Sequence, residues 1–331
     1  MLVNLPLKII GLGRYLPSRI VSSSELEMKW SLPAGWVEQH NGVRERRWAM
    51  SETSSFMAAE AAREAFDEAS IKPGDINLII NASGTGEQAI PDTGALIQRQ
   101  LGLGKSGIPA ITVNNTCLSF ITAMDVAANY LQSGRYKNIL IASSDISSCG
   151  INPKEPDSAS LVGDAAAAAV VTRSRHGECS AIHHAHLATY GEGAYLTTIM
   201  GGGSARHPSK PDHNSDDDLF SMSGLALLRM VRGIDEKFLE ELYPGLSKSL
   251  CDIDIVVPHQ ASKVGLHMLR RFCWPEDRVI QTLQWLGNCV AASIPATLYQ
   301  AVRDGSLQRG KKALLIGTGA GISMGGLVMT Y

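Results

Sequence analysis

The chain has 331 residues, of which 44% are hydrophobic and 19% are charged, so it can bury one large core or two of ordinary size. Its 30 basic and 32 acidic residues give a net charge of −2, so there is no positive excess to hold nucleic acid or an anionic membrane surface. No run approaches the roughly 18 apolar residues that span a bilayer, and the N-terminus lacks the basic head and long apolar segment of a secretion signal.

The six cysteines show no CxxC pair and no spacing typical of metal ligands. Such cysteine usage fits reduced thiols in a cytoplasm better than a framework of disulfides. We therefore expect a cytoplasmic protein with no metal, no nucleic-acid partner and no membrane partner.

The first predicted strand covers Lys8–Gly11, and a faint internal repeat follows it. An amphipathic helix pattern over Ala58–Ala69 precedes an apolar strand over Asp75–Ile80, and a similar helix over Leu225–Leu242 precedes a strand over Asp252–Val257. This order of elements predicts two related halves.

A second pair of strands supports the repeat. Asn138–Ala142 and Ala313–Gly317 are both entered from lysine, and continuous apolar runs of this kind are typical of central strands with helices on both faces. The halves meet at a polar break after residue 172, which predicts an N-terminal half over 1–172 and a C-terminal half over 173–331. No linker separates them, so we expect one fused unit with a site between the halves.

The segment Gly201–Asp218 carries three consecutive glycines, two prolines and three consecutive aspartates, and it predicts a long exposed loop. Such a loop either covers an entrance or is solvated decoration.

Cys117 stands between an apolar strand over Ile111–Val113 and a small-residue helix that begins at Leu118. A thiol at a helix N-terminus faces unpaired N–H groups and the positive end of the helix dipole, and both favour the thiolate. This position predicts a nucleophile, and the alternative is a buried, inert cysteine. Later in the chain a strand ends on His259 and a turn presents Asn288, which makes a set of cysteine, histidine and asparagine.

Five short segments carry a resemblance to a known family, and all of them occur in the family's order along the chain. They resemble the motifs of β-ketoacyl-ACP synthase III, a group of condensing enzymes with the thiolase fold, and they are Gly42–Arg46, Thr116–Cys117, Val162–Ala165, Pro258–Ala261 and Gly287–Asn288. The resemblance covers nearly the whole chain. It implies an α/β thiolase fold in which two duplicated halves form a five-layered αβαβα sandwich.

The resemblance implies an acyltransferase that performs a decarboxylative Claisen condensation of an acyl-CoA primer with malonyl-ACP. Cys117 would carry the acyl group, and His259 and Asn288 would hydrogen-bond the malonyl thioester carbonyl. The backbone N–H groups of Cys117 and Ala320 would form the oxyanion hole. The family has no resident cofactor, takes CoA and carrier-bound thioesters as substrates in fatty-acid or secondary-metabolite synthesis, and forms homodimers.

The positions that bind CoA and the carrier depart from the family pattern. Trp36 matches a tryptophan that stacks on the adenine of CoA, but His40 replaces the arginine that usually follows it. Two other arginines of the family pattern are missing, since one aligns near Pro156 and the other with Val264. Lys263 is adjacent to Val264. The residues that the resemblance assigns to substrate binding are Trp36, His40, Ile90, Gly224, Ala261 and Lys263.

Two alternatives remain open. The chain is also similar, around Cys117 and over Gly317–Gly321, to enzymes that condense two acyl-CoA molecules without decarboxylation. The glutamate base of those enzymes aligns with Ile90, and Glu87 is nearby in the sequence. A related alternative is acyl transfer to an alcohol or amine. The second alternative is that the chain is a catalytically silent partner in a heterodimer.

Three further features receive structural interpretations. Gly317–Gly321 is too near the chain end to open a dinucleotide-binding unit. The histidines at 183, 184 and 186 are interpreted as a strand or surface feature rather than a metal site. Arg44, Arg46 and Arg47 would either meet an acidic carrier protein or pair with carboxylates, and charge alone favours neither.

Overall fold

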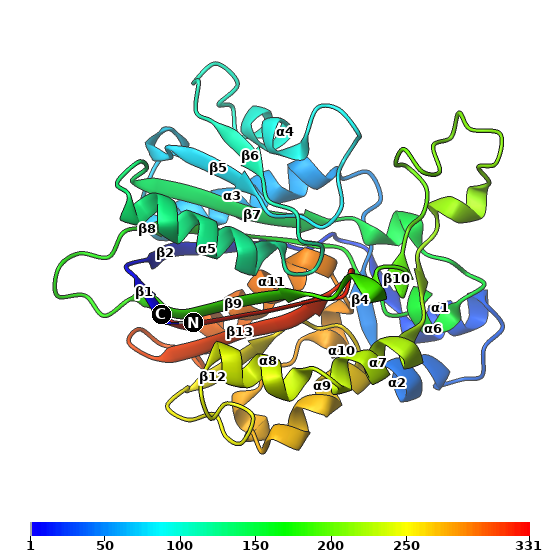
Figure 1. Ribbon diagram of the computed structural model, residues 1–331. Helices are drawn as coiled ribbons and strands as arrows, with labels where there is room; N and C mark the ends of the chain where they lie inside the picture. The colour runs from blue at the N-terminus through cyan, green and yellow to red at the C-terminus, as the bar shows by residue number, and fades with distance from the viewer. Residues whose placement is uncertain (1) are drawn as a thin grey trace.

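Two five-stranded sheets, with strand orders β2-β8-β7-β5-β6 and β1-β9-β14-β13-β12, form the centre of the computed structural model, which describes residues 2–331 (Figure 1). The first sheet consists of β2 (Lys8–Tyr15), β8 (Ala165–Thr172), β7 (Asn138–Asp145), β5 (Leu78–Asn81) and β6 (Ala110–Thr112). The second consists of β1 (Leu2–Leu5), β9 (Ala181–Thr189), β14 (Ser323–Thr330), β13 (Lys312–Gly319) and β12 (Ile255–Pro258).

Helices cover both outer faces and fill the space between the sheets (Figure 1). The first sheet is covered by α3 (Ser54–Ala69), which packs on β2 and β8, and the second by α8 (Asp235–Leu242), which packs on β9 and β14. The central layer contains α5 (Ser119–Gln132) and α11 (Ser293–Arg303), which contact strands of both sheets. The expected five-layered αβαβα arrangement is therefore confirmed.

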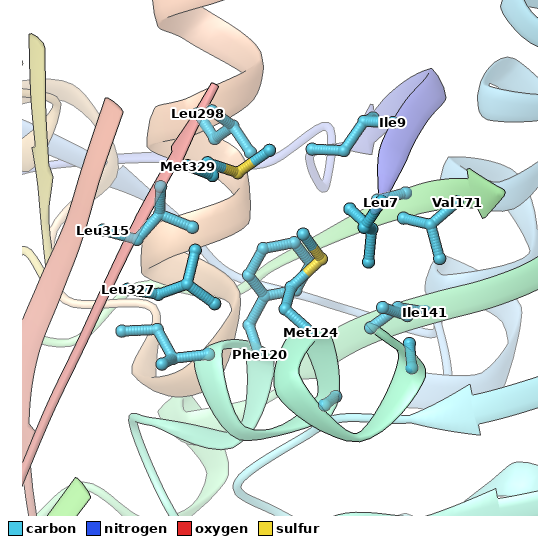
Figure 2. Close-up of a cluster of buried hydrophobic side chains, with 14 of the residues drawn as sticks. Leu7, Ile9, Phe120, Met124, Ile141, Val171, Leu298, Leu315, Leu327 and Met329 are labelled. Atoms are coloured by element: carbon cyan, nitrogen blue, oxygen red, sulfur yellow. The ribbon is translucent and has the colours of Figure 1, made fainter. Parts of the chain in front are cut away.

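The main core lies in the central layer, where α5 and α11 meet the inner faces of the two sheets. Figure 2 shows Phe120 and Met124 of α5 among strand residues from both sheets, with Leu298 of α11 next to Met329 of β14. All three side chains are fully buried. Packing on both sides explains why so few polar residues occur along α5.

The internal repeat is visible in the strand order. β5 and β7 are parallel neighbours and β8 is antiparallel to β7, and β12, β13 and β14 repeat this pattern. The strands of the first sheet all lie at or before residue 172, and those of the second sheet lie after it, with the exception of β1. β1 pairs with β9 in the second sheet, whereas β2, which begins three residues after β1 ends, pairs with β8 in the first. Residues 2–15 thus contribute to both sheets.

One helix prediction was wrong in extent. The pattern over Leu225–Leu242 forms two helices, α7 (Gly224–Arg232) and α8, because the chain leaves the helix at Gly233 and Ile234. Glycine disfavours a helix interior by about 1 kcal/mol relative to alanine, and here it ends α7. The exposed loop predicted over 201–218 is confirmed, and it lies between β10 (Thr197–Thr198) and β11 (Ser221–Met222) with the short helix η4 (Ser215–Asp218) at its end.

The smaller elements flank the two sheets. They are β3 (Ile20–Ser22), β4 (Glu45–Arg47), α1 (Ser23–Lys29), α2 (Trp36–Asn41), α4 (Thr93–Gln100), α6 (Pro156–Ala159), α9 (Lys263–Met268), α10 (Leu283–Leu286), η1 (Pro73–Asp75), η2 (Ser147–Gly150), η3 (Gly191–Gly193), η5 (Leu269–Phe272), η6 (Glu276–Arg278) and η7 (Val290–Ala292). All six cysteines are free thiols. None of the helices within residues 2–331 combines the length and the apolar character needed to cross a membrane.

The three histidines lie on β9, as expected, and each has its own neighbour. His183 Nε2 lies 2.7 Å from Thr330 Oγ1, His186 Nε2 lies 3.1 Å from the Glu241 carboxylate, and the His184 ring contacts Tyr243. Over the described part of the chain, no group of three or more histidine, cysteine, aspartate or glutamate side chains is placed to hold a metal ion.

Candidate active site

Cys117 lies in a tight turn between β6 and α5, two residues before the first residue of α5. Asn114 Oδ1 accepts the Thr116 N–H at 2.9 Å, and Ser119 Oγ accepts the Asn115 N–H at 2.9 Å. Thr116 has a φ of 48°, a left-handed conformation that is rare for a β-branched residue. The turn therefore fixes the position of the following cysteine by hydrogen bonds on both sides of a strained residue.

The expected thiolate is not the resting state. Burial of the sulfur and the nearby charge of Asp145 raise the pKa of the Cys117 thiol to about 12. The N–H groups of Cys117 and Ala320 lower the pKa, as the helix-start argument requires, but they act more weakly than burial. The thiolate prediction was therefore wrong for the protein without substrate, while the two N–H groups do converge on the sulfur.

Alkylation of Cys117 by iodoacetamide is expected to accelerate about tenfold per pH unit between pH 7 and pH 9, without a plateau, because only the thiolate reacts and its fraction grows throughout this range. Intact-mass spectrometry over time measures the rate. Subtracting the alkylation of Cys117→Ala removes the contribution of exposed thiols such as Cys149. A plateau near pH 7 would contradict the raised pKa.

Asp145, at the end of β7, is a buried carboxylate that the sequence analysis did not identify. Its Oδ1 accepts the Gly84 N–H at 2.9 Å, the Thr85 N–H at 2.8 Å and the Thr85 hydroxyl at 2.9 Å, and its Oδ2 accepts the Ala292 N–H at 3.2 Å. Burial raises the pKa of this carboxyl to about 6. Asp145 thus joins the loop after β5 to the segment that follows Asn288. Its only sequence signal was an acidic residue at the end of an apolar strand.

Asp145→Asn is expected to accelerate alkylation of Cys117 several-fold at pH 8, because removing the carboxylate charge lowers the pKa of the thiol. The same change is expected to lower the free energy of unfolding by about 1–3 kcal/mol, because the new amide cannot accept every N–H that the carboxylate accepts. Asp125→Asn, which removes a carboxylate from α5, is the matched control. Equal alkylation rates in Asp145→Asn and wild type would exclude an electrostatic effect of Asp145 on the sulfur.

His259 follows β12 directly, and its backbone N–H donates to the Ile316 carbonyl at 2.8 Å. The residue is only 6% exposed, and burial lowers the pKa of its imidazole to about 4. The ring is therefore neutral at physiological pH. Its Nδ1 is buried and has no hydrogen-bond partner among residues 2–331. An uncharged imidazole with a free ring nitrogen can still hydrogen-bond a substrate atom.

Asn288 has its side-chain amide held by two backbone groups. Its Oδ1 accepts the Val290 N–H at 3.0 Å, and its Nδ2 donates to the Ala261 carbonyl at 3.2 Å. Because Ala261 lies two residues after His259, this bond places the carboxamide beside the histidine segment. The second N–H of the amide stays available to a substrate, since an amide nitrogen carries two donors.

The strand β13 brings Cys117 and His259 to the same edge of the second sheet. A Cβ at Gly317 would lie 2.6 Å from His259 Cβ, and a Cβ at Gly319 would lie 2.6 Å from Thr116 Oγ1. Two residues along a strand span about 7 Å. The cysteine turn and His259 therefore contact β13 at points about that far apart. These glycines permit the close approach, and the structure brings the predicted cysteine, histidine and asparagine together.

Trp36 and His40 lie on the same face of α2 and stack on each other. Their ring centroids are 4.4 Å apart with planes at 22°, and His40 Nδ1 lies 2.9 Å from the Trp36 carbonyl oxygen. One face of the indole is thus already covered by the imidazole. An aromatic ligand such as adenine would therefore have to stack on the other face.

The remaining residues assigned to substrate binding lie in different places. Lys263 Nζ donates to the Gln39 carbonyl at 2.8 Å and borders a hollow of about 450 Å³ that also includes His267 and Arg270, which we call the basic hollow. Gly224 begins α7, where a side chain would meet only Met222 Cε at 3.9 Å. Ile90 lies in the loop before α4 and is 87% exposed.

The three arginine candidates, Arg44, Arg46 and Arg47, lie in different environments. Arg46 is fully buried and donates to the Val21 and Ser160 carbonyls and to Ser23 Oγ, so it cannot meet a carrier protein. Arg44 pairs with Glu38 at 3.2 Å, as the ion-pair alternative predicts. Arg47 donates to the Pro17 carbonyl at 3.3 Å.

Glu87 is also engaged elsewhere. Its carboxylate accepts the Ser55 N–H at 2.7 Å in the first turn of α3. The carboxylate therefore lies at the positive end of the α3 dipole. This hydrogen bond to α3 disfavours Glu87 as the base of a non-decarboxylating condensation.

Comparison with known proteins finds the same similarity over almost the entire chain. Residues 111–191 match the family model described as 3-oxoacyl-(acyl-carrier-protein) synthase III, and residues 247–331 match the model of its C-terminal part. β-Ketoacyl-(acyl-carrier-protein) synthase III of Aquifex aeolicus is 33% identical over 328 residues, covering 98% of this chain and 99% of the relative. The Coxiella burnetii protein of the same name is 33% identical over 326 residues, covering 97% and 98%.

Solved structures give the same result for the fold. The crystal structure of the Aquifex aeolicus 3-oxoacyl-(acyl-carrier-protein) synthase III superposes with a TM-score of 0.85 at 31% identity, covering 98% of this chain and 100% of that one. A variant of OleA from Xanthomonas campestris superposes with a TM-score of 0.86 at 21% identity, covering 100% of both chains. At that identity the second similarity concerns the fold alone.

Proposed function

Because the chain belongs to the β-ketoacyl-ACP synthase III family of thiolase-fold acyltransferases, we propose that it condenses an acyl-CoA primer with malonyl-ACP by decarboxylation. The observation that carries this proposal is the meeting of Cys117, His259 and Asn288 at one edge of the second sheet. A nucleophile beside two neutral hydrogen-bonding groups suits a reaction with one covalent step and one enolate.

In the first step the Cys117 sulfur attacks the acyl-CoA carbonyl. A carbon–sulfur bond forms to Cys117, the bond to CoA breaks, and CoA leaves as the thiol with the proton that Cys117 loses. The N–H groups of Cys117 and Ala320 point at the sulfur, so they are placed to stabilise the oxyanion on the adjacent carbon. The raised pKa of the thiol means that proton loss accompanies the attack rather than preceding it.

In the second step His259 and Asn288 hold the malonyl thioester carbonyl while carbon dioxide leaves. The resulting carbanion attacks the acyl-cysteine carbonyl, a carbon–carbon bond forms, the bond to the sulfur breaks, and the sulfur takes up a proton. Decarboxylation produces the carbanion without a proton-abstracting base, which agrees with the lowered pKa of His259 and with the engagement of Glu87 at α3.

The thioester substrates have suitable contact points outside the catalytic residues. The uncovered face of Trp36 suits the adenine of CoA, and the cations of the basic hollow suit the phosphates of CoA or of carrier-bound phosphopantetheine. Lys263 supports this use because it borders the hollow next to the position of a missing family arginine. A homodimer would cover the exposed Ile90, an apolar side chain that is 87% accessible in the single chain.

The test is incubation with a labelled acyl-CoA in the presence and absence of malonyl-ACP, followed by mass spectrometry of protein and product. We expect 3-ketoacyl-ACP and carbon dioxide only when malonyl-ACP is present, whereas acylation of Cys117 releases one equivalent of free CoA without it. Product without malonyl-ACP would instead support condensation of two acyl-CoA molecules or transfer to another acceptor. Failure to acylate Cys117 with any acyl-CoA would support the silent-partner alternative.

A further inference from the structure

Thr116, directly before Cys117, carries a hydroxyl that the cysteine turn leaves without a partner. The backbone N–H of Thr116 donates to Asn114 Oδ1 at 2.9 Å, and its carbonyl accepts the Ser119 N–H at 3.2 Å and the Ser119 hydroxyl at 2.7 Å. The hydroxyl oxygen is buried and makes no hydrogen bond of ordinary geometry within residues 2–331. The hydroxyl is therefore the polar group of this residue that the turn does not satisfy.

The neighbouring hydroxyls of the same segment are fully engaged. Ser119 Oγ accepts the Asn115 N–H at 2.9 Å as well as donating to the Thr116 carbonyl. Thr122 Oγ1 accepts from Asn115 Nδ2 at 3.1 Å and donates to the Leu118 carbonyl at 3.0 Å. Thr116 by contrast combines an unpaired buried hydroxyl with a left-handed φ of 48°, and such unfavourable features cluster where a reaction requires them.

The Thr116 hydroxyl is held beside the sulfur of Cys117. A Cβ at Gly319 would lie 2.6 Å from Thr116 Oγ1, so the glycine leaves the space that the hydroxyl occupies. Burial and the charge of Asp145 raise the pKa of the thiol. The Thr116 hydroxyl lowers this pKa, as do the N–H groups of Cys117 and Ala320. A neutral thiol is a weak acceptor, which explains why the hydroxyl makes no ordinary hydrogen bond to it before the reaction starts.

Negative charge develops on the sulfur in both steps of the proposed reaction. It develops during acylation, when the thiol loses its proton, and during condensation, when the carbon–sulfur bond breaks and its electron pair stays on the sulfur. In both tetrahedral intermediates the oxyanion occupies the N–H groups of Cys117 and Ala320. A hydrogen bond to the sulfur must then come from another donor, and a hydroxyl can rotate about its C–O bond to supply it.

We propose that Thr116 is a further catalytic residue, whose hydroxyl donates a hydrogen bond to the Cys117 sulfur whenever that sulfur carries negative charge. This inference rests on the proposed function and adds a residue to the same site. The hydroxyl keeps its own proton throughout. In condensation the sulfur receives the electron pair of the broken bond and then takes a proton from solvent, so Thr116 ends each cycle unchanged.

The first experiment measures the sulfur without any substrate. Thr116→Val keeps the branched shape and removes the hydroxyl, whereas Thr116→Ser keeps the hydroxyl and removes the methyl group. Alkylation of Cys117 by iodoacetamide at pH 8 is expected to slow about threefold in Thr116→Val, because the thiolate fraction falls about tenfold while the more basic sulfur attacks about threefold faster. Thr116→Ser should react near the wild-type rate.

The control variant is Thr172→Val, which makes the same change at the far end of β8, where the hydroxyl donates to the Lys137 carbonyl at 2.9 Å. It should alkylate as wild type does. Thermal unfolding should show Thr116→Val to be at least as stable as wild type, because valine removes a buried unpaired hydroxyl. A slower reaction in a protein of equal or greater stability excludes misfolding as the cause. Alkylation of Thr116→Val at the wild-type rate, or of folded Thr116→Ser as slowly as Thr116→Val, overturns the proposal.

The second experiment follows the acyl-cysteine in single-turnover assays with an acyl-CoA that acylates wild type, followed by malonyl-ACP. Thr116→Val is expected to slow the loss of the acyl group from Cys117 at least about tenfold, the scale of one hydrogen bond to a charged atom, and Thr116→Ser should restore the rate. Normal turnover of the acyl-cysteine by Thr116→Val overturns the catalytic role and leaves the proposed function standing. Slow alkylation of Thr116→Val in a protein whose wild type forms no acyl-cysteine contradicts the proposed function and leaves the hydrogen bond standing.

Discussion

Replacing Cys117 by serine is expected to reduce condensation at least about 10⁴-fold, the scale seen when a covalent nucleophile is lost. A serine hydroxyl is far harder to deprotonate than a thiol and needs a strong neighbouring base. The site provides none, because burial lowers the pKa of the His259 imidazole to about 4. The hydroxyl would therefore remain protonated and unreactive in the same turn.

The decisive measurement is the intact mass of the protein after exposure to a panel of acyl-CoAs. Wild type should gain one acyl group, and Cys117→Ser should gain none, while the production of 3-ketoacyl-ACP falls in parallel. Cys273→Ser, which changes an exposed thiol, is the matched control and should behave as wild type. Condensation by Cys117→Ser at the wild-type rate would refute the assignment of the nucleophile.

Replacement of His259 or Asn288 by alanine is expected to lower condensation by about 10²–10³-fold, the usual cost of removing one donor to a developing oxyanion. Acylation of Cys117 should change by less than about tenfold, because the N–H groups that serve the first step belong to Cys117 and Ala320. The two half-reactions should therefore separate in these variants.

Single-turnover assays measure the two steps, first with acyl-CoA alone and then with malonyl-ACP added to the acylated protein. His176→Ala removes an exposed histidine from the turn between β8 and β9 and should leave both rates unchanged. Equal losses in acylation and condensation would show that His259 and Asn288 act on the nucleophile rather than on the donor.

The layered fold was predictable because its signals are local and repeated. The apolar runs over 75–80 and 252–257 correspond because β5 and β12 each run parallel to a neighbour, β7 or β13, that is in turn antiparallel to β8 or β14. The helix after Cys117 ends at Gln132, directly before Ser133 and Gly134, a glycine position that is common at helix ends. The break between α7 and α8 was missed because a single glycine weakens a helix without requiring it to end.

The chemistry of the site was less predictable, because it depends on groups that are distant in sequence. A helix start indicates a lowered thiol pKa, but burial of the sulfur and the charge of Asp145 reverse that effect, and neither is visible near residue 117. The sequence suggests that Arg46 is a surface cation. Only the fold shows that its side chain is fully buried and therefore cannot contact another protein. The roles of these groups follow from burial, which a local pattern does not determine.

The division of residues 2–15 between the two sheets has a consequence for the whole molecule. β1 completes an edge of one sheet and β2 an edge of the other, with only Pro6 and Leu7 between them. This short segment connects the two sheets. Truncating it would expose an edge of each sheet at once and would destabilise the site although the change lies outside it. The protein should accordingly melt in a single cooperative transition rather than half by half.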